Sequence, residues 1–133
     1  SSAGENGSQG GADNVLIGRL AGAGTWSSSP TSKNVAIGTL AMGTGTKNSA
    51  DNNVAIGYKA LEDITTGDKN VCIGSNAGAA LENDIKNVFI GFEAGLASTA
   101  NNVVAIGHQA MKGAAVQECS NWAKCFNDCW WNF

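Results

Sequence analysis

Charged residues and proline are scarce in this sequence of 133 residues. Asp, Glu, Lys and Arg together make up 14% of it, and proline occurs once. With a formal net charge of −3, the chain lacks the clustered Lys and Arg by which proteins bind nucleic acid. No apolar run approaches the roughly 18 residues of a membrane-spanning helix, so we expect no membrane insertion. The 18 glycines indicate many tight backbone turns.

The sequence also offers little that would support catalysis. Its one histidine, His108, would have to serve any Ser-His or Cys-His pair alone. It occupies a position of the repeat described below that holds Arg, Thr, Tyr, Ser or Phe in the other copies, which indicates a solvated side chain. Glycine pairs such as Gly22 and Gly24 lack the strand–loop–helix context and the Lys-Ser/Thr of a phosphate loop. We therefore expect no enzyme activity, no cofactor and no metal site.

A short unit, Asn-Val-x-Ile-Gly-x-x-Ala, occurs six times and organises most of the chain. Its asparagines are Asn14, Asn34, Asn53, Asn70 and Asn87, and its glycines are Gly18, Gly38, Gly57, Gly74, Gly91 and Gly107. The sixth copy has Val103 where the others have asparagine. Six copies at steps of 16 to 20 residues identify a repeat protein.

Each unit has the chemistry of a short β-strand followed by a turn. Val and Ile are β-branched and two residues apart, so they lie on one face of a strand, while the intervening residue x lies on the other. We expect the Val and Ile side chains to be buried in two stacked columns, and x to point away from that core. The residues concerned are Val15, Ile17, Val35, Ile37, Val54, Ile56, Val71, Ile73, Val88, Ile90, Val104 and Ile106. The asparagine tolerates a left-handed conformation, and stacked asparagines predict an amide ladder.

One unit cannot bury its apolar residues alone, whereas units stacked about 4.8 Å apart can. The period of two and the following glycine argue against helices. Residues 14–113 are therefore predicted to form an all-β, parallel β-solenoid of about six rungs. The segments 22–33, 42–52, 61–69, 78–86 and 95–102 are expected to be surface loops, where either recognition or neutral variation accounts for their differing lengths.

The unit Asn-Val-Ala-Ile-Gly, as at residues 34–38 and 53–57, resembles the head repeats of trimeric autotransporter adhesins. It is similar also to repeats of phage tail-fibre proteins, in which Gly-Tyr-x-Ala-Leu continues the unit as at residues 57–61. The resemblance covers residues 14–111. It implies a left-handed parallel β-roll, assembly as a homotrimer, and adhesion or receptor attachment without catalysis.

The two ends of the chain differ from the repeat. Residues 1–13 are a polar, glycine-rich arm that is too poor in apolar residues to fold alone. Residues 114–133 form a Cys/Trp-rich segment with apolar residues at helical spacing, which predicts a C-terminal helical cap. Either this helix covers the open end of the solenoid, or it forms a subunit contact, and both alternatives use the same residues. They are Trp122, Phe126, Trp130, Trp131 and Phe133.

The four cysteines, Cys72, Cys119, Cys125 and Cys129, favour an oxidising compartment, although buried reduced thiols remain the alternative. The last three lack the tight CxxC pairing of zinc ligands. We expect one of them to pair with Cys72 or with another chain, while the other two pair or stay free.

Two functions are consistent with these features. The first is a structural subunit of a self-assembling extracellular fibre or filament. The alternative is the head of a trimeric adhesin, or a viral tail-fibre module, that binds a glycan or protein receptor on a cell surface. Both place the chain outside the cell, at a cell surface or on a virion, and both require association with copies of itself as a homotrimer or polymer.

Overall fold

The computed structural model describes residues 11–27 and 29–113, and this part of the chain is all-β. It contains six strands of three residues, one in each copy of the repeat. They are β1 (Val15–Ile17), β2 (Val35–Ile37), β3 (Val54–Ile56), β4 (Val71–Ile73), β5 (Val88–Ile90) and β6 (Val104–Ile106).

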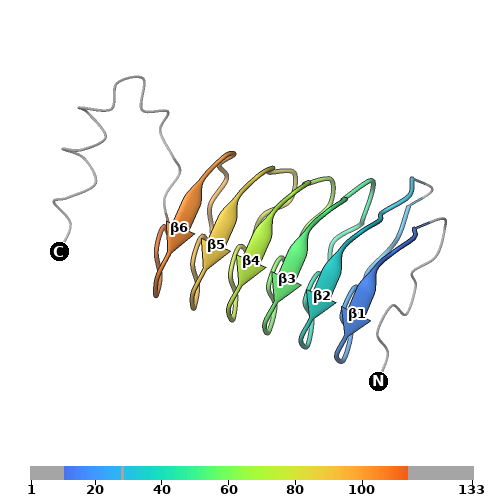
Figure 1. Cartoon of the computed structure of the whole chain (residues 1–133), viewed down its shortest axis with the longest axis horizontal. Coiled ribbons are helices and arrows are strands. Elements are labelled where there is room, and N and C mark those ends of the chain that lie inside the picture. Colours follow the sequence, from blue (N-terminus) through green and yellow to red (C-terminus); the bar gives the residue numbers. More distant parts are fainter. Residues whose placement is uncertain (1–10, 28, 114–133) are drawn as a thin grey trace, which may run out of the picture.

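The strands form one parallel sheet in the order of the sequence, β1 to β6 (Figure 1). Each repeat position pairs with the same position of the next repeat, so Val35 faces Val54 and Ile37 faces Ile56. The chain makes about five turns, each adding one rung. The predicted parallel β-solenoid is thus confirmed.

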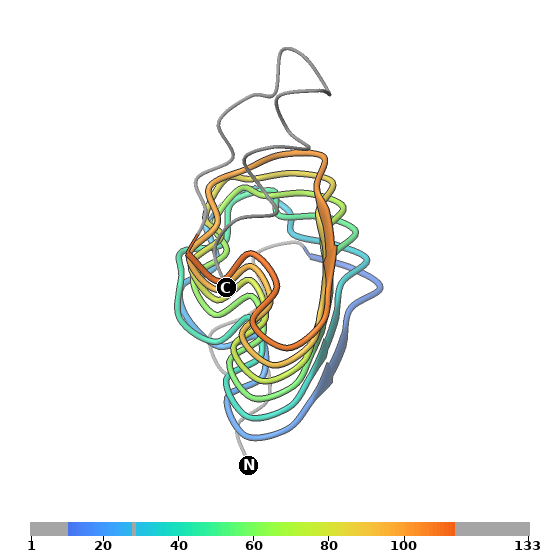
Figure 2. The ribbon, with the colours of Figure 1, turned by 90° about the vertical axis from the view of Figure 1, so that its left-hand side faces the viewer.

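Seen along the stack, the turns superpose, with the strands on one side and the joining segments closing the coil on the other (Figure 2). The joining segments are not merely surface loops. Leu61, Ile64 and Leu81 are fully buried and belong to the single hydrophobic core. Each turn therefore contributes apolar side chains from the loop side as well as from its strand.

The orientation predicted for the strand residues is wrong, because the core lies on the opposite face. The intervening residue x points inward: Ala36, Ala55, Cys72, Phe89 and Ala105 are buried. In the end strands the Val and Ile side chains are exposed, with Val15 and Ile17 at 45% and 55%. In β2 to β5 they are half-buried. A period of two separates two faces of a strand but does not say which one meets the core.

The narrow interior explains this choice. The alanines that follow the repeat glycines are fully buried in the first five rungs, so the coil closes tightly over the column of x residues. They are Ala21, Ala41, Ala60, Ala77 and Ala94. The one aromatic ring at x, that of Phe89, fits because Gly95 has no side chain: a Cβ there would lie 2.3 Å from the ring. Columns of paired Val and Ile would be too wide for such an interior.

Tight stacking also requires the repeat glycine. Gly57 has a φ of +133°, and a Cβ on it would lie 2.6 Å from the carbonyl oxygen of Gly74 on the next rung. The left-handed conformation that we expected at the repeat asparagine lies one residue earlier. The residues there are Asp13, Lys33, Asn52, Lys69, Lys86 and Asn102, with φ of 59–61°. The preceding residue makes the turn, so that the asparagine can enter the core.

Two predictions fall on residues that the structure does not describe. Residues 1–10 comprise most of the polar arm, and residues 114–133 comprise the predicted helical cap. Both therefore stay predictions.

Candidate functional site

The outer face of the sheet carries two parallel columns of Val and Ile, which we call the Val/Ile face. Its exposure is greatest on β6, where Val104 and Ile106 are 67% and 66% exposed. None of its twelve positions is charged or polar, and each of β2 to β5 is paired with a neighbouring strand on both sides. Contiguous exposed apolar patches larger than a few hundred Å² are rare on monomers and mark interaction surfaces.

Next to the Val/Ile face runs the column of residues that follow the repeat glycines. Tyr58 and Phe92 are 49% and 44% exposed. The rings of Phe92 and His108 stack with their centroids 5.3 Å apart and their planes inclined by 17°. The Lys59 ammonium lies 5.7 Å from the centre of the Tyr58 ring. As predicted, His108 is exposed, and its contact with Phe92 adds aromatic surface to this column.

Inside the coil, the predicted amide ladder is present. Asn34, Asn53, Asn70 and Asn87 are buried, and each Oδ1 accepts a hydrogen bond from the backbone N–H of the following rung. Asn14, at the first rung, does the same for Asn34 at 2.9 Å. The amide nitrogens donate to joining-segment carbonyls, for example Asn53 Nδ2 to Gly67 O at 2.8 Å. The ladder thus ties each strand both to its neighbour and to the loop side of its own turn.

A second row of hydrogen bonds, which no pattern in the sequence predicted, joins the residues that lie two positions before each repeat asparagine. The backbone N–H of Ala12 donates to Ser32 Oγ at 3.1 Å, and that of Ser32 donates to Asp51 Oδ1 at 2.5 Å. The backbone N–H of Asp51 in turn donates to Asp68 Oδ1 at 2.7 Å. We call this row the corner ladder. Its acceptors are Ser, Asp and Asn in different rungs, so no single residue type reveals it in the sequence.

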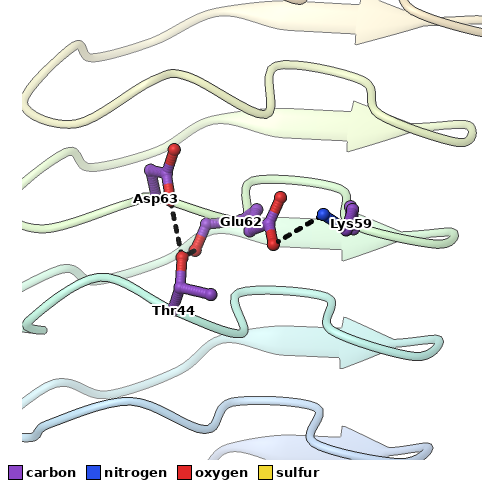
Figure 3. Close-up of polar contacts among 4 residues, drawn as sticks. All are labelled: Thr44, Lys59, Glu62 and Asp63. Carbon is purple, nitrogen blue, oxygen red and sulfur yellow. Dashed lines mark hydrogen bonds and ion pairs between the residues drawn. The ribbon is translucent and has the colours of Figure 1, made fainter.

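Polar contacts also join the loops on the far side from the strands (Figure 3). Thr44 Oγ1 donates to Asp63 Oδ1 at 2.6 Å and to the Glu62 carbonyl oxygen at 3.1 Å. Lys59 pairs with Glu62 at 3.2 Å, and this hydrogen bond raises the pKa of Lys59. The Thr44 bonds join two neighbouring turns, whereas the half-buried Lys59–Glu62 pair lies within one turn, and surface pairs of this kind stabilise a fold only weakly.

Lys47 is a functional group that the sequence analysis missed. Its side chain is fully buried, and its ammonium donates to the carbonyl oxygens of Ala23 at 2.7 Å and Gly45 at 3.0 Å. Burial lowers its pKa to about 8, although the charge of Asp63 opposes this shift. Its backbone also bridges to the segment around Trp26. Lys47 therefore holds together the two longest joining segments, in a part of the sequence that indicated only a surface loop.

The structure places Cys72 in the core rather than on the outer surface. Its thiol is fully buried, and burial raises its pKa to about 12, so it is protonated and unreactive at neutral pH. A bond from Cys72 to another chain would require its rung to open. The other disulfide candidates, Cys119, Cys125 and Cys129, lie outside the described residues, as do the aromatic residues of the predicted cap. Their pairing stays a prediction.

Within residues 11–27 and 29–113 there is no group of three or more His, Cys, Asp or Glu side chains arranged to hold a metal ion. The same residues include no helix that is long and apolar enough to cross a membrane. Comparison of the chain with protein-family models, curated proteins and solved structures gives no match. The fold and its surfaces define a parallel β-solenoid repeat protein, and the resemblance to adhesin and tail-fibre repeats depends on the repeat residues alone.

Proposed function

We propose that this chain is a non-enzymatic structural subunit of an extracellular fibre or filament, and that it associates with copies of itself through the Val/Ile face. The observation that carries the proposal is the unbroken outward apolar surface over six rungs, which is half-buried on β2 to β5 and exposed on the end strands, with Val15 at 45% and Val104 at 67%. Leaving it in water is unfavourable by about 25 cal/mol for each Å² of apolar surface.

A second copy of the chain fits this surface better than another occupant. The backbone groups of β2 to β5 are paired on both sides, so a partner that covers the Val/Ile face must offer side-chain packing rather than an added strand. The Val/Ile face is flat and regular, and a second one has the same rung spacing and is also uncharged. Self-association would also add buried area to a domain whose own core is narrow, and small single cores are marginally stable.

The finer features of this proposal come from the repeat. The resemblance to adhesin and tail-fibre repeats supports a left-handed β-roll, a homotrimer and an extracellular location. The cysteine content is consistent with an oxidising compartment. These features belong to the same proposal, because three apolar faces can meet around one axis and exclude water from all of them.

A second candidate function is favoured by the exposed aromatic column. Tyr58 and the stacked Phe92–His108 pair lie beside the Val/Ile face and present ring surfaces to solvent. Aromatic rings with polar edges are common at recognition surfaces. This column supports a trimeric adhesin head or viral tail-fibre module that binds a glycan or protein receptor.

Replacing one outward isoleucine tests self-association. We expect the purified chain to have a mass that is a multiple of 13.5 kDa by light scattering at micromolar concentration. Ile56→Lys should shift it towards 13.5 kDa, because the interface would have to bury an ammonium, while circular dichroism stays unchanged. Thr46→Lys is the matched control: it adds the same charge at an exposed loop residue and should leave the mass unchanged. A monomeric wild-type chain would refute the proposal.

A further inference from the structure

The two ladders run in opposite directions along the stack. In the amide ladder, the earlier rung supplies the acceptor: Asn53 Oδ1 receives the backbone N–H of Asn70 at 2.9 Å. In the corner ladder, the later rung supplies it: Asp68 Oδ1 receives the backbone N–H of Asp51 at 2.7 Å. A junction that keeps both rows therefore needs one suitable side chain from each of the two rungs that meet.

Each of the two outermost described rungs lacks the one acceptor side chain that a junction with another copy would need from it. The amide-ladder position of the last rung is Val103, whose backbone N–H donates to Asn87 Oδ1 at 3.0 Å but whose side chain cannot accept. The corner-ladder position of the first rung is Ala12, whose backbone N–H donates to Ser32 Oγ at 3.1 Å but whose side chain also cannot accept. Each ladder thus ends at the rung that would have to supply the next acceptor.

Consider a second copy that stacks its β1 on β6 in the register of the internal rungs. The backbone N–H of its Asn14 would meet Val103, and the backbone N–H of Asn101 would meet its Ala12. Neither amide would find its acceptor. The Asn14 N–H would lie in the junction where the inner amide-ladder N–H groups are buried, and without a partner there it costs free energy. The Asn101 N–H lies at an exposed corner, where water replaces part of the lost bond, so its loss adds a smaller cost.

The interior shows how much of this loss the fold tolerates. At the junction between the rungs of β4 and β5, the fourth of the five, the corner-ladder residue Ile85 has no side-chain acceptor for the backbone N–H of Asp68. The bond at the next junction is present, because the backbone N–H of Ile85 donates to Asn101 Oδ1 at 2.5 Å. The amide ladder at that fourth junction is present, from Asn87 N–H to Asn70 Oδ1 at 3.0 Å. One missing acceptor is thus compatible with stacking when the other row is intact and the chain is continuous. A junction between copies would have neither advantage.

We propose that Val103 and Ala12 close the two ends of the stack against end-to-end growth. Copies then join only side by side along the Val/Ile face, and the bundle keeps the length of a single stack. This inference rests on the proposed function for the side-by-side contact, but the closure of the ends can be tested without it.

The experiment restores both acceptors in the full chain. Ala12→Ser with Val103→Asn places a hydroxyl and an amide where the internal rungs have them. Ala12→Val with Val103→Ala is the matched control, because it changes the same positions without adding an acceptor. Particle length is measured by negative-stain electron microscopy, and mass by sedimentation, over a hundredfold range of protein concentration.

We expect wild-type and control particles of one length at every concentration, and rods of the Ser/Asn variant that lengthen at least twofold as concentration rises. Wild-type rods that lengthen, or Ser/Asn rods no longer than the control, would overturn the inference. A monomeric wild type would refute the side-by-side contact, yet it agrees with closed ends, and elongation of the Ser/Asn variant would still support them. The two proposals therefore fail on different results.

Discussion

Removing one asparagine from the middle of the amide ladder should destabilise the whole stack. Asn53 is fully buried, and its amide makes three hydrogen bonds. Nδ2 donates to Gly67 O at 2.8 Å, and Oδ1 accepts from the backbone N–H of Asn70 at 2.9 Å and from Asn70 Nδ2 at 3.2 Å. Asn53→Ala removes all three and leaves a space that the rigid rungs above and below cannot close.

The expected loss follows from which groups are left without partners. Asn70 Nδ2 keeps its bond to Asp84 O at 2.8 Å, so that group stays satisfied. The Asn70 backbone N–H and the Gly67 carbonyl each lose the partner described above. An unsatisfied buried polar group costs about 1–3 kcal/mol, so with two such groups the free energy of unfolding should fall by about 2–6 kcal/mol.

Urea denaturation at one fixed protein concentration measures this loss, and hydrogen exchange reports the Asn70 amide directly. Asn48→Ala is the control, because Asn48 is exposed and accepts only from Ser27 Oγ at 3.0 Å, and it should cost less than about 0.5 kcal/mol. If Asn53→Ala costs no more than the control and the Asn70 amide exchanges no faster, the ladder is not a source of stability and the reasoning is refuted.

Two further predictions concern the glycine column and the buried lysine. In thermal unfolding, Gly57→Ala should destabilise the fold by about 2 kcal/mol or more beyond the loss caused by Gly107→Ala. Both glycines have φ above +130°, but in the described structure only Gly57 lies against another rung. Equal losses of stability in the two variants would contradict this. Burial lowers the pKa of Lys47 from 10.5 to about 8. Between these two pH values the unfolded chain therefore binds more protons than the folded chain. The free energy of unfolding should rise across this pH range by roughly 3 kcal/mol in total. The measurement compares Cys72→Ala with the double variant Cys72→Ala/Lys47→Met, because the raised pKa of the Cys72 thiol would by itself make stability fall above pH 9. The rise of stability with pH should be absent from the double variant. An unchanged slope would show that Lys47 is not its source.

The sequence alone predicted the parallel β-solenoid that the described residues form. Six copies of one unit, each with a β-branched pair and a glycine, predicted one strand for each copy and parallel stacking in register. The asparagine that recurs in the repeat predicted the amide ladder, because an amide at one position of a stacked repeat has its own copies as neighbours. These predictions depend on local chemistry and on periodicity, which are both written in the residues.

The face that the core occupies could not be read from the same pattern. Alternation distinguishes Ile37 from Ala36 but gives no sign of which side closes, and hydrophobicity favoured the wrong one. The deciding quantity is the width of the coil, which depends on how the Ala column and the joining segments pack from the opposite side. For the same reason Cys72 and Phe89 read as freely varying outward residues, although they are fully buried.

The buried Lys47 and the corner ladder show the same division. A lysine between Thr46 and Asn48 indicates a solvated loop, and only the closure of two neighbouring turns brings the carbonyls of Ala23 and Gly45 to its ammonium. The sequence by itself determined that this protein is a stack of like rungs. The tertiary structure decided which side of each rung is core and which is free for contact, because that choice depends on distances between turns that no single repeat contains.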